Sequence, residues 1–220
     1  MLNAHDFNPG DRLHRLVKLA LDTGEAATLA DAERLFAGYR LQLAVGPDAA
    51  TSATFQAAVL TAVNTGRRCF LGGVRAAGAL EVPLVVPWPS CRTLGEAIIN
   101  LGGSVDAALE PDVPLVVFGD ASVPPPTGAF AVRATFDGWA GGVVPLGDDR
   151  RLAERREFAP AGVLAGALAV SEAFQSARGD VRAGHREVGL SLWQPEATVD
   201  WLSGVEPGPT RPRLPARLWL

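Results

Sequence analysis

The stretch that decides the fold is residues 41–66, which read LQLAVGPDAATSATFQAAVLTAVNTG. Leu41, Leu43 and Val45 fall on alternate positions, and this period of two predicts a strand that ends at Gly46. The period then changes, because apolar residues recur at helical spacing. These residues are Phe55, Ala58, Val59, Ala62 and Val63. A strand joined to a helix by a short turn is the unit from which parallel sheets are built, so the stretch indicates an α/β fold.

The same alternation continues on both sides of this unit. Further strands are predicted at 80–86, 114–119 and 130–136. Further helices are predicted at 12–22, from Thr28 onward, at 93–101 and at 160–177, where Thr28, Thr93 and Pro160 are good helix-start residues. Strands that alternate with helices imply right-handed crossovers. We therefore expect a three-layer, Rossmann-like α/β fold, with a mostly parallel sheet, helices on both faces and two preceding N-terminal helices.

Three parts are predicted along the chain. Residues 1–38 form an N-terminal helical extension, 39–202 a Rossmann-like domain, and 203–220 a proline-rich linker. The last four residues, 217–220, resemble the opening of a strand. From this we expect the chain to be the front portion of a longer protein, and the alternative is an apolar C-terminal plug that docks on the domain.

Composition excludes several classes of protein. Of 220 residues, 48% are hydrophobic and 20% charged, which is too apolar for a disordered chain. The net charge of −4 argues against a nucleic-acid partner. The two cysteines, Cys69 and Cys91, cannot build a disulfide-rich scaffold or a four-cysteine zinc site. Because no apolar run reaches the ~20 residues that span a bilayer and no signal peptide is visible, we expect a cytoplasmic protein with no membrane contact.

The order of these elements resembles the adenylation fold of the ThiF/MoeB superfamily, which includes the ubiquitin-activating enzymes. The resemblance covers roughly 39–175. It depends on 41–66, on the strand 115–118 followed by Gly119-Asp120, and on the small-residue helix 161–173. Members of this superfamily adenylate the C-terminal glycine of a ubiquitin-like protein, and several pair an inactive half with an active one.

The chain departs from that superfamily where nucleotide would bind. Only Gly46 remains of the glycine-rich loop, and the acidic ribose-binding residue has no clear counterpart at 74–80. The ATP-binding lysine has no counterpart because Lys18 lies in an N-terminal helix, and the paired CxxC zinc ligands are absent. The resemblance therefore implies an inactive half: a non-catalytic pseudoenzyme scaffold at the front of a larger activating protein. Its partner would be a second ThiF-like half, another protein, or a second copy in a homodimer.

The candidate nucleotide-binding residues are Gly46, Asp48 and Ser52, which precede a helix N-terminus of the kind that binds phosphate. However, Pro47 removes a backbone donor, and Asp48 adds negative charge where a phosphate would lie. A plain turn in which Asp48 or Ser52 caps the helix is the alternative. Asp120 is a candidate catalytic residue beside Mg²⁺, or else a turn residue. If the chain is active, these residues predict an ATP-dependent adenylyltransferase; we expect no cofactor otherwise.

A third hypothesis is a thiol enzyme that uses Cys91. A helix N-terminus and the adjacent Arg92 would lower the pKa of this thiol, although no histidine lies near it in sequence. The alternative is a passive loop thiol.

Two further features have both a structural and a functional interpretation. Gly162 and Gly166 indicate close packing against the sheet or a contact between protomers. Trp193 and Trp201 belong either to the core or to an exposed aromatic edge that binds a partner.

Overall fold

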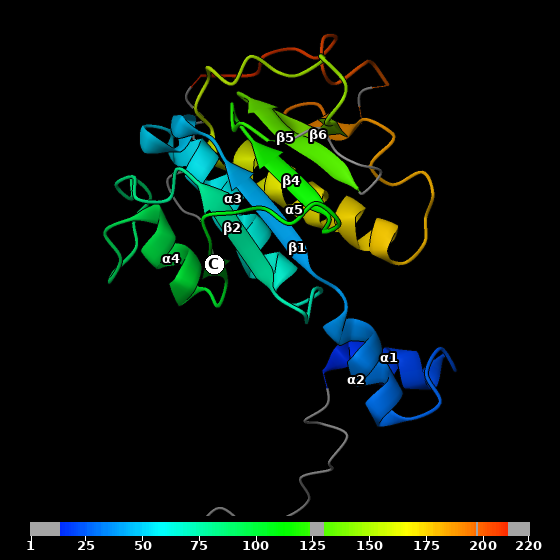
Figure 1. Ribbon diagram of the computed structural model, residues 1–220. Helices are drawn as coiled ribbons and strands as arrows, with labels where there is room; N and C mark the ends of the chain where they lie inside the picture. Colours follow the sequence, from blue (N-terminus) through cyan, green and yellow to red (C-terminus); the bar gives the residue numbers. More distant parts are fainter. Residues whose placement is uncertain (1–13, 124–129, 197, 211–220) are drawn as a thin grey trace, which may run out of the picture.

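A computed structural model describes residues 14–123, 130–196 and 198–210 (Figure 1). Within them, seven strands form one sheet in the order β3-β2-β1-β4-β5-β6-β7. The strands are β1 (Leu41–Val45), β2 (Val74–Gly78), β3 (Ser104–Val105), β4 (Leu115–Phe118), β5 (Ala131–Asp137), β6 (Ala140–Pro145) and β7 (Val188–Ser191). The helices are α1 (Arg15–Asp22), α2 (Leu29–Ala37), the short 3₁₀ helix η2 (Pro47–Ala50), α3 (Ala53–Gly66), α4 (Leu94–Asn100) and α5 (Ala159–Ala177).

Five strands of the sheet, from β3 through β5, pair in parallel, and β6 and β7 add to it antiparallel. The chain builds outward from β1 to β2 and β3, and then returns to place β4 on the other side of β1. The register pairs Val45 with both Gly78 and Phe118, so β1, β2 and β4 end at the same edge. The α/β class, the mostly parallel sheet and the two N-terminal helices are confirmed.

The main core lies between one face of the sheet and helices α3, α4 and α5. Figure 1 shows α3 and α5 behind the strands. A smaller apolar cluster lies on the opposite face, where Ala44 and Val117 are covered by Leu109, Val123 and other residues. That layer is built more from loops than from helices. Helices α1 and α2 have a separate small core centred on Phe36 and lie beyond the end of the sheet.

Glycines set the distance between α3 and α5. A Cβ atom on Gly162 would lie 2.1 Å from the Thr54 carbonyl oxygen, and one on Gly166 would lie 2.2 Å from the Ala58 oxygen. Neither position has room for a side chain, so the two helix backbones touch. The packing interpretation of these glycines is confirmed, but their partner is α3 rather than the sheet.

Most predicted helix starts are confirmed. Thr28 caps α2, Ser52 caps α3, and Thr93 with Glu96 forms a complete capping box on α4. Helix α5 begins one residue before Pro160. The first helix begins at Arg15, and residues 12 and 13 of its predicted range lie outside the described residues.

The strand predicted at 80–86 is wrong. The second strand is Val74–Gly78, and 80–86 forms a loop. The buried Gln56 side chain explains this conformation, because its Nε2 donates to Pro83 O at 2.8 Å and its Oε1 accepts from Val85 N at 2.7 Å. A side chain from α3 thus satisfies backbone groups that a neighbouring strand would otherwise pair. The sequence analysis also missed β3, β6 and β7.

Residues 203–210 lie against the domain rather than apart from it. Trp201 is buried beside Ala140 and Val144, and Leu202 and Val205 pack on this small core. Trp201 belongs to the core, whereas Trp193 is half exposed. Residues 217–220, predicted to open a strand, lie outside the described residues. None of the described helices is long and apolar enough to cross a membrane.

Candidate functional site

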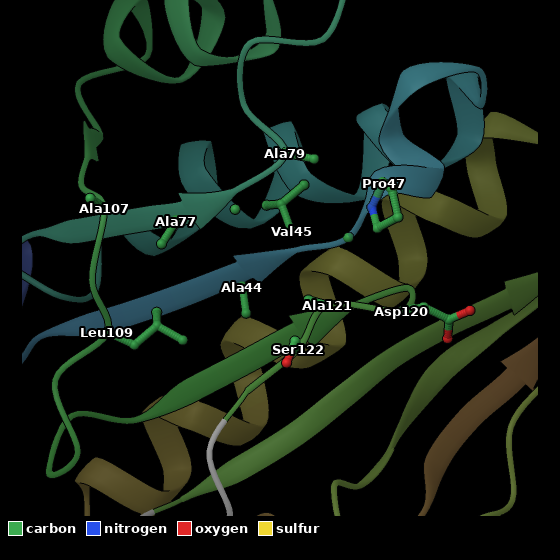
Figure 2. A pocket seen from close by; sticks show the side chains of 12 residues that line it. Ala44, Val45, Pro47, Ala77, Ala79, Ala107, Leu109, Asp120, Ala121 and Ser122 are labelled. Atoms are coloured by element: carbon green, nitrogen blue, oxygen red, sulfur yellow. The ribbon is translucent and has the colours of Figure 1, made fainter.

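A hollow of about 530 Å³ lies at the edge where β1, β2 and β4 end (Figure 2). Strand order reverses between β1 and β4, which is where doubly wound sheets bind ligands. Small side chains line most of it, and among the described lining residues Asp120 alone is charged. The lining residues include Ala44, Gly46, Ala77, Gly78, Ala107, Asp120 and Ser122.

Gly46 lets two turns of the protein approach each other. Its N–H donates to Phe118 O at 2.9 Å. A Cβ at this position would lie 2.7 Å from the Asp120 nitrogen and 2.9 Å from the Ala121 nitrogen. The turn after β4 therefore requires this glycine, and its presence needs no phosphate to explain it.

Asp48 bonds to the same turn. Its Oδ2 accepts a hydrogen bond from the backbone N–H of Asp120 at 3.1 Å. Gly119 adopts a φ of +62°, and a Cβ there would lie 2.5 Å from that Oδ2. The carboxylate thus takes up a backbone donor that faces the end of β1, and it joins the two turns.

The N-terminus of α3 is occupied by oxygens of the protein itself. Ser52 Oγ accepts from the Phe55 N–H at 2.9 Å, and Glu157 Oε2 accepts from the Thr54 N–H at 3.0 Å. A helix N-terminus attracts anions through such unpaired N–H groups and the positive end of the helix dipole. Here a carboxylate is already bound at that position. Sequence reasoning missed Glu157, which lies 103 residues from Thr54 and carries no local signal.

Asp120 belongs to a network of charged side chains from the turn after β4, β5 and the loop before α5. Its Oδ1 lies 2.6 Å from Nη1 of Arg151, whose Nη2 lies 3.7 Å from Glu154 Oε2. Arg133 donates to the Gly119 carbonyl oxygen. Both arginines near the site are therefore paired with protein groups. Sequence reasoning missed Arg133, Arg151 and Glu154, because the tertiary fold alone brings them together.

Glu154 has the most unusual environment of this network. It adopts a φ of +54°, in the region that favours glycine, and its Oε1 accepts from the Thr135 hydroxyl at 2.8 Å. Burial raises the pKa of Glu154, and the charge of Asp48 adds to this, although Thr135, Arg151 and Arg133 act in the opposite direction. Burial likewise lowers the pKa of Arg133. The cluster joins loops of the protein, with Glu154 buried inside it and Asp120 largely exposed at its rim.

Cys91 is half buried at the margin of the main core. The capping box of α4 already uses the nearby donors, since Glu96 Oε2 accepts from the N–H groups of Arg92 and Thr93. Among the described residues, no hydrogen bond joins Cys91 to a base. Burial raises the pKa of the other thiol, Cys69. The structure brings Gly46, Asp48 and Asp120 together, places Ser52 on the adjoining helix, and leaves Cys91 on a separate loop.

In the described parts of the chain, no three His, Cys, Asp or Glu side chains are arranged to hold a metal ion. The carboxylates at Asp48 and Glu157 lie where phosphate oxygens would otherwise find donors.

The fold and this edge of the sheet define a Rossmann-like α/β domain. The chain belongs to the BilD N-terminal domain family, whose model matches residues 40–192. It is 37% identical over 209 residues to a bacterial E1-like protein, BilD, from Collimonas sp. (strain OK412). The match covers 94% of this chain and 45% of that relative, so the chain spans about half the length of the protein it matches.

Proposed function

We propose that this chain is a non-catalytic, ThiF-like scaffold domain, and that it forms the front part of a larger protein that activates a ubiquitin-like protein. One observation carries the proposal: the N-terminus of α3, where a Rossmann-type sheet would bind phosphate, holds Glu157 and Ser52 instead. A phosphate would have to displace a carboxylate that already pairs with the Thr54 N–H.

The charges around the hollow support the same proposal. Adenylation requires cations near the phosphates, because negative charge develops there during the reaction. None of the described lining residues is basic. Arg151 is paired with Asp120, and Arg133 is bonded to Gly119 O. Both arginines therefore already bind groups of the protein itself.

The partner in this proposal is an active half that adenylates its substrate. The relative of greater length is named as E1-like, and this chain aligns with 45% of it. An inactive half that supports an active one would account for a domain of this family whose phosphate position is filled by its own side chains.

A thermal-shift titration with ATP–Mg tests the proposal, with NAD as a control ligand. A ligand at 100-fold its Kd stabilises a protein by about 2.7 kcal/mol, which is a shift of several degrees for a chain of this size. We expect no shift with either ligand. The variant Glu157→Gln, which keeps an acceptor for Thr54 and removes the charge, should also show none. A clear shift of the wild-type chain with ATP alone would overturn the proposal.

The alternative is an active ATP-dependent adenylyltransferase, and one observation favours it. The hollow lies at the switch point of the sheet, with Asp120 on its rim. That function requires ATP binding by the wild-type chain, with loss of binding in Asp120→Ala. If the wild-type chain binds no ATP, the alternative is excluded for this chain on its own.

A further inference from the structure

Three aromatic side chains gather at one end of the antiparallel part of the sheet, and we call them the aromatic seat: Trp139, Phe158 and Trp193. Trp139 lies in the turn between β5 and β6, Phe158 immediately precedes α5, and Trp193 follows β7. The ring centroids of Trp139 and Phe158 are 4.0 Å apart, and those of Trp139 and Trp193 are 5.5 Å apart. Elements far apart in the sequence thus build a single aromatic surface.

The segment Pro207-Gly208-Pro209 contacts Trp139 of this seat. Trp139 Nε1 donates to the Pro209 carbonyl oxygen at 2.8 Å. A Cβ on Gly208 would lie 2.5 Å from Trp139 Cδ1, so the backbone of this glycine touches the indole ring. The segment is also held on its N-terminal side, where the Glu206 N–H donates to Gln194 Oε1 at 3.1 Å.

Two independent properties select glycine at position 208. Its φ of +66° lies in the left-handed region, which other residues adopt at a cost. The close approach of the indole leaves no room for a side chain. Both properties fit the conformation of 207–209 to the surface beneath it.

The chemistry of the seat suits proline. Proline has no N–H, so its carbonyl oxygen is the group that a binding site can recognise, and an indole N–H is a donor without acceptor properties. Aromatic rings also offer flat apolar surface to proline rings, and the φ of +66° at Gly208 distinguishes this segment from the polyproline II helices that bind aromatic grooves. A pocket of about 360 Å³ remains between the seat and the segment, walled by Arg156 and Glu157 as well.

We propose that the aromatic seat is a recognition site for a Pro-Gly-Pro segment, occupied in this chain by its own residues 207–209. The occupant is the chain itself because the Trp139–Pro209 bond, the Gly208 contact and the Glu206–Gln194 bond all lie within one molecule. This inference does not depend on whether the domain binds nucleotide.

The test is hydrogen exchange in the full chain, followed at the Glu206 amide and the Trp139 indole N–H. In the wild type we expect both to be protected. Gly208→Ala should accelerate exchange at both by about tenfold or more, because it removes the docked state while the core stays folded. Gly24→Ala is the matched control: Gly24 has a similar φ of +73° with nothing within 4 Å of its Cβ position, so it should leave both sites unchanged.

A second variant separates the hydrogen bond from the packing. Trp139→Phe keeps an aromatic ring and removes the indole N–H, so exchange at Glu206 should rise by a smaller factor than in Gly208→Ala. Three results would overturn the proposal: wild-type sites that exchange like a free chain, equal effects of Gly208→Ala and Gly24→Ala, or protection that disappears on dilution. The last result would mean that the segment comes from a second copy.

Discussion

The two faces of the sheet are covered in different ways. On one face, α3 and α5 approach so closely that Gly162 and Gly166 touch the backbone of α3. On the other, loop residues such as Leu109 and Val123 cover a small apolar cluster. Gln42 of β1 points to that loop side and is 2% exposed, and its Nε2 donates to Glu110 O at 2.7 Å and to Val113 O at 3.2 Å.

Helices and loops that cover a sheet differ in how their backbone N–H and C=O groups are hydrogen-bonded. A helix pairs its own backbone groups, so the contact between α3 and α5 depends on shape and apolar packing. A loop over a sheet leaves backbone groups unpaired, and side chains must satisfy them. Gln42 performs this role on the loop face, and Gln56 of α3 performs it for the 80–86 loop, which packs against the helix-side core. The helix face should therefore be sensitive to volume, and the loop face to the loss of hydrogen bonds.

The largest effect is expected from Gly162→Ala on the helix face. The added methyl group would lie 2.1 Å from Thr54 O, so α3 and α5 must separate. Overpacking of this kind costs about 3 kcal/mol. Chemical denaturation of the variant would measure this loss. Gly147→Ala is the control, since nothing lies within 4 Å of its Cβ position. A similar stability for both variants would contradict the close contact between the backbones of α3 and α5.

The loop face is tested by Gln42→Met, which keeps most of the volume and removes the amide. The variant leaves Glu110 O, Val113 O and the Glu110 N–H, which bonds Gln42 Oε1 at 2.6 Å, without these partners. Unsatisfied buried groups cost about 1–3 kcal/mol, so we expect a loss of about 2 kcal/mol. Amide exchange should show the loosening at 106–113 before it reaches α3. An equal loss of amide protection on both faces of the sheet would contradict this difference between the two faces.

A smaller loss of stability is expected when Glu157 is removed from the N-terminus of α3. Glu157→Ala removes the acceptor of the Thr54 N–H and the negative charge at the helix N-terminus, which together contribute about 1 kcal/mol. Glu157→Gln should lose less, because an amide oxygen still accepts. Thermal unfolding of the two variants at low and high salt separates the charge from the hydrogen bond. If Glu157→Ala is as stable as the wild type, the carboxylate does not cap this helix in solution.

The smallest effect is expected in the pH dependence of the free energy of unfolding. The folded-state pKa of Glu154 is raised, so its contribution is greatest below the unfolded-state value of about 4.3 and falls as pH rises towards the folded-state pKa. In the Glu154→Gln variant, the free energy of unfolding should therefore fall less as pH rises. The pKa of Asp137 shifts in the opposite direction. Burial raises this pKa, but hydrogen bonds from Arg156 and the Arg155 N–H outweigh burial and lower it overall.

Asp137 therefore stabilises the fold above the unfolded-state pKa of aspartate and loses that contribution as pH falls through its own pKa. Asp137→Asn should weaken acid destabilisation. Unfolding midpoints between about pH 3 and pH 8 check both variants. Slopes of the same sign for Glu154→Gln and Asp137→Asn would show that the two carboxyls do not differ as described.

Much of the fold could be predicted because local signals and final structure agreed. The alternation at Leu41–Val45, the caps at Ser52 and Thr93, and the apolar run of β4 all act over a few residues. The prediction failed where a distant residue decided the conformation. The loop 80–86 has a strand-like sequence, but Gln56 binds its backbone from α3. In β6, which the sequence did not predict, Gly142 leaves room for Trp201 and Gly141 for the backbone of α5 at Ala161.

In the candidate site, too, some features follow from local sequence and others from contacts with distant residues. The sequence by itself determined that Gly46, Asp48 and Ser52 surround the turn between a strand and a helix, because that depends on periodicity and chain order. Only the tertiary structure decided what meets them: Asp48 bonds to the Asp120 N–H, and Glu157 reaches the N-terminus of α3 from more than one hundred residues away. Periodicity reports contacts along an element, whereas the partner of a buried donor is chosen by the packing of the whole chain.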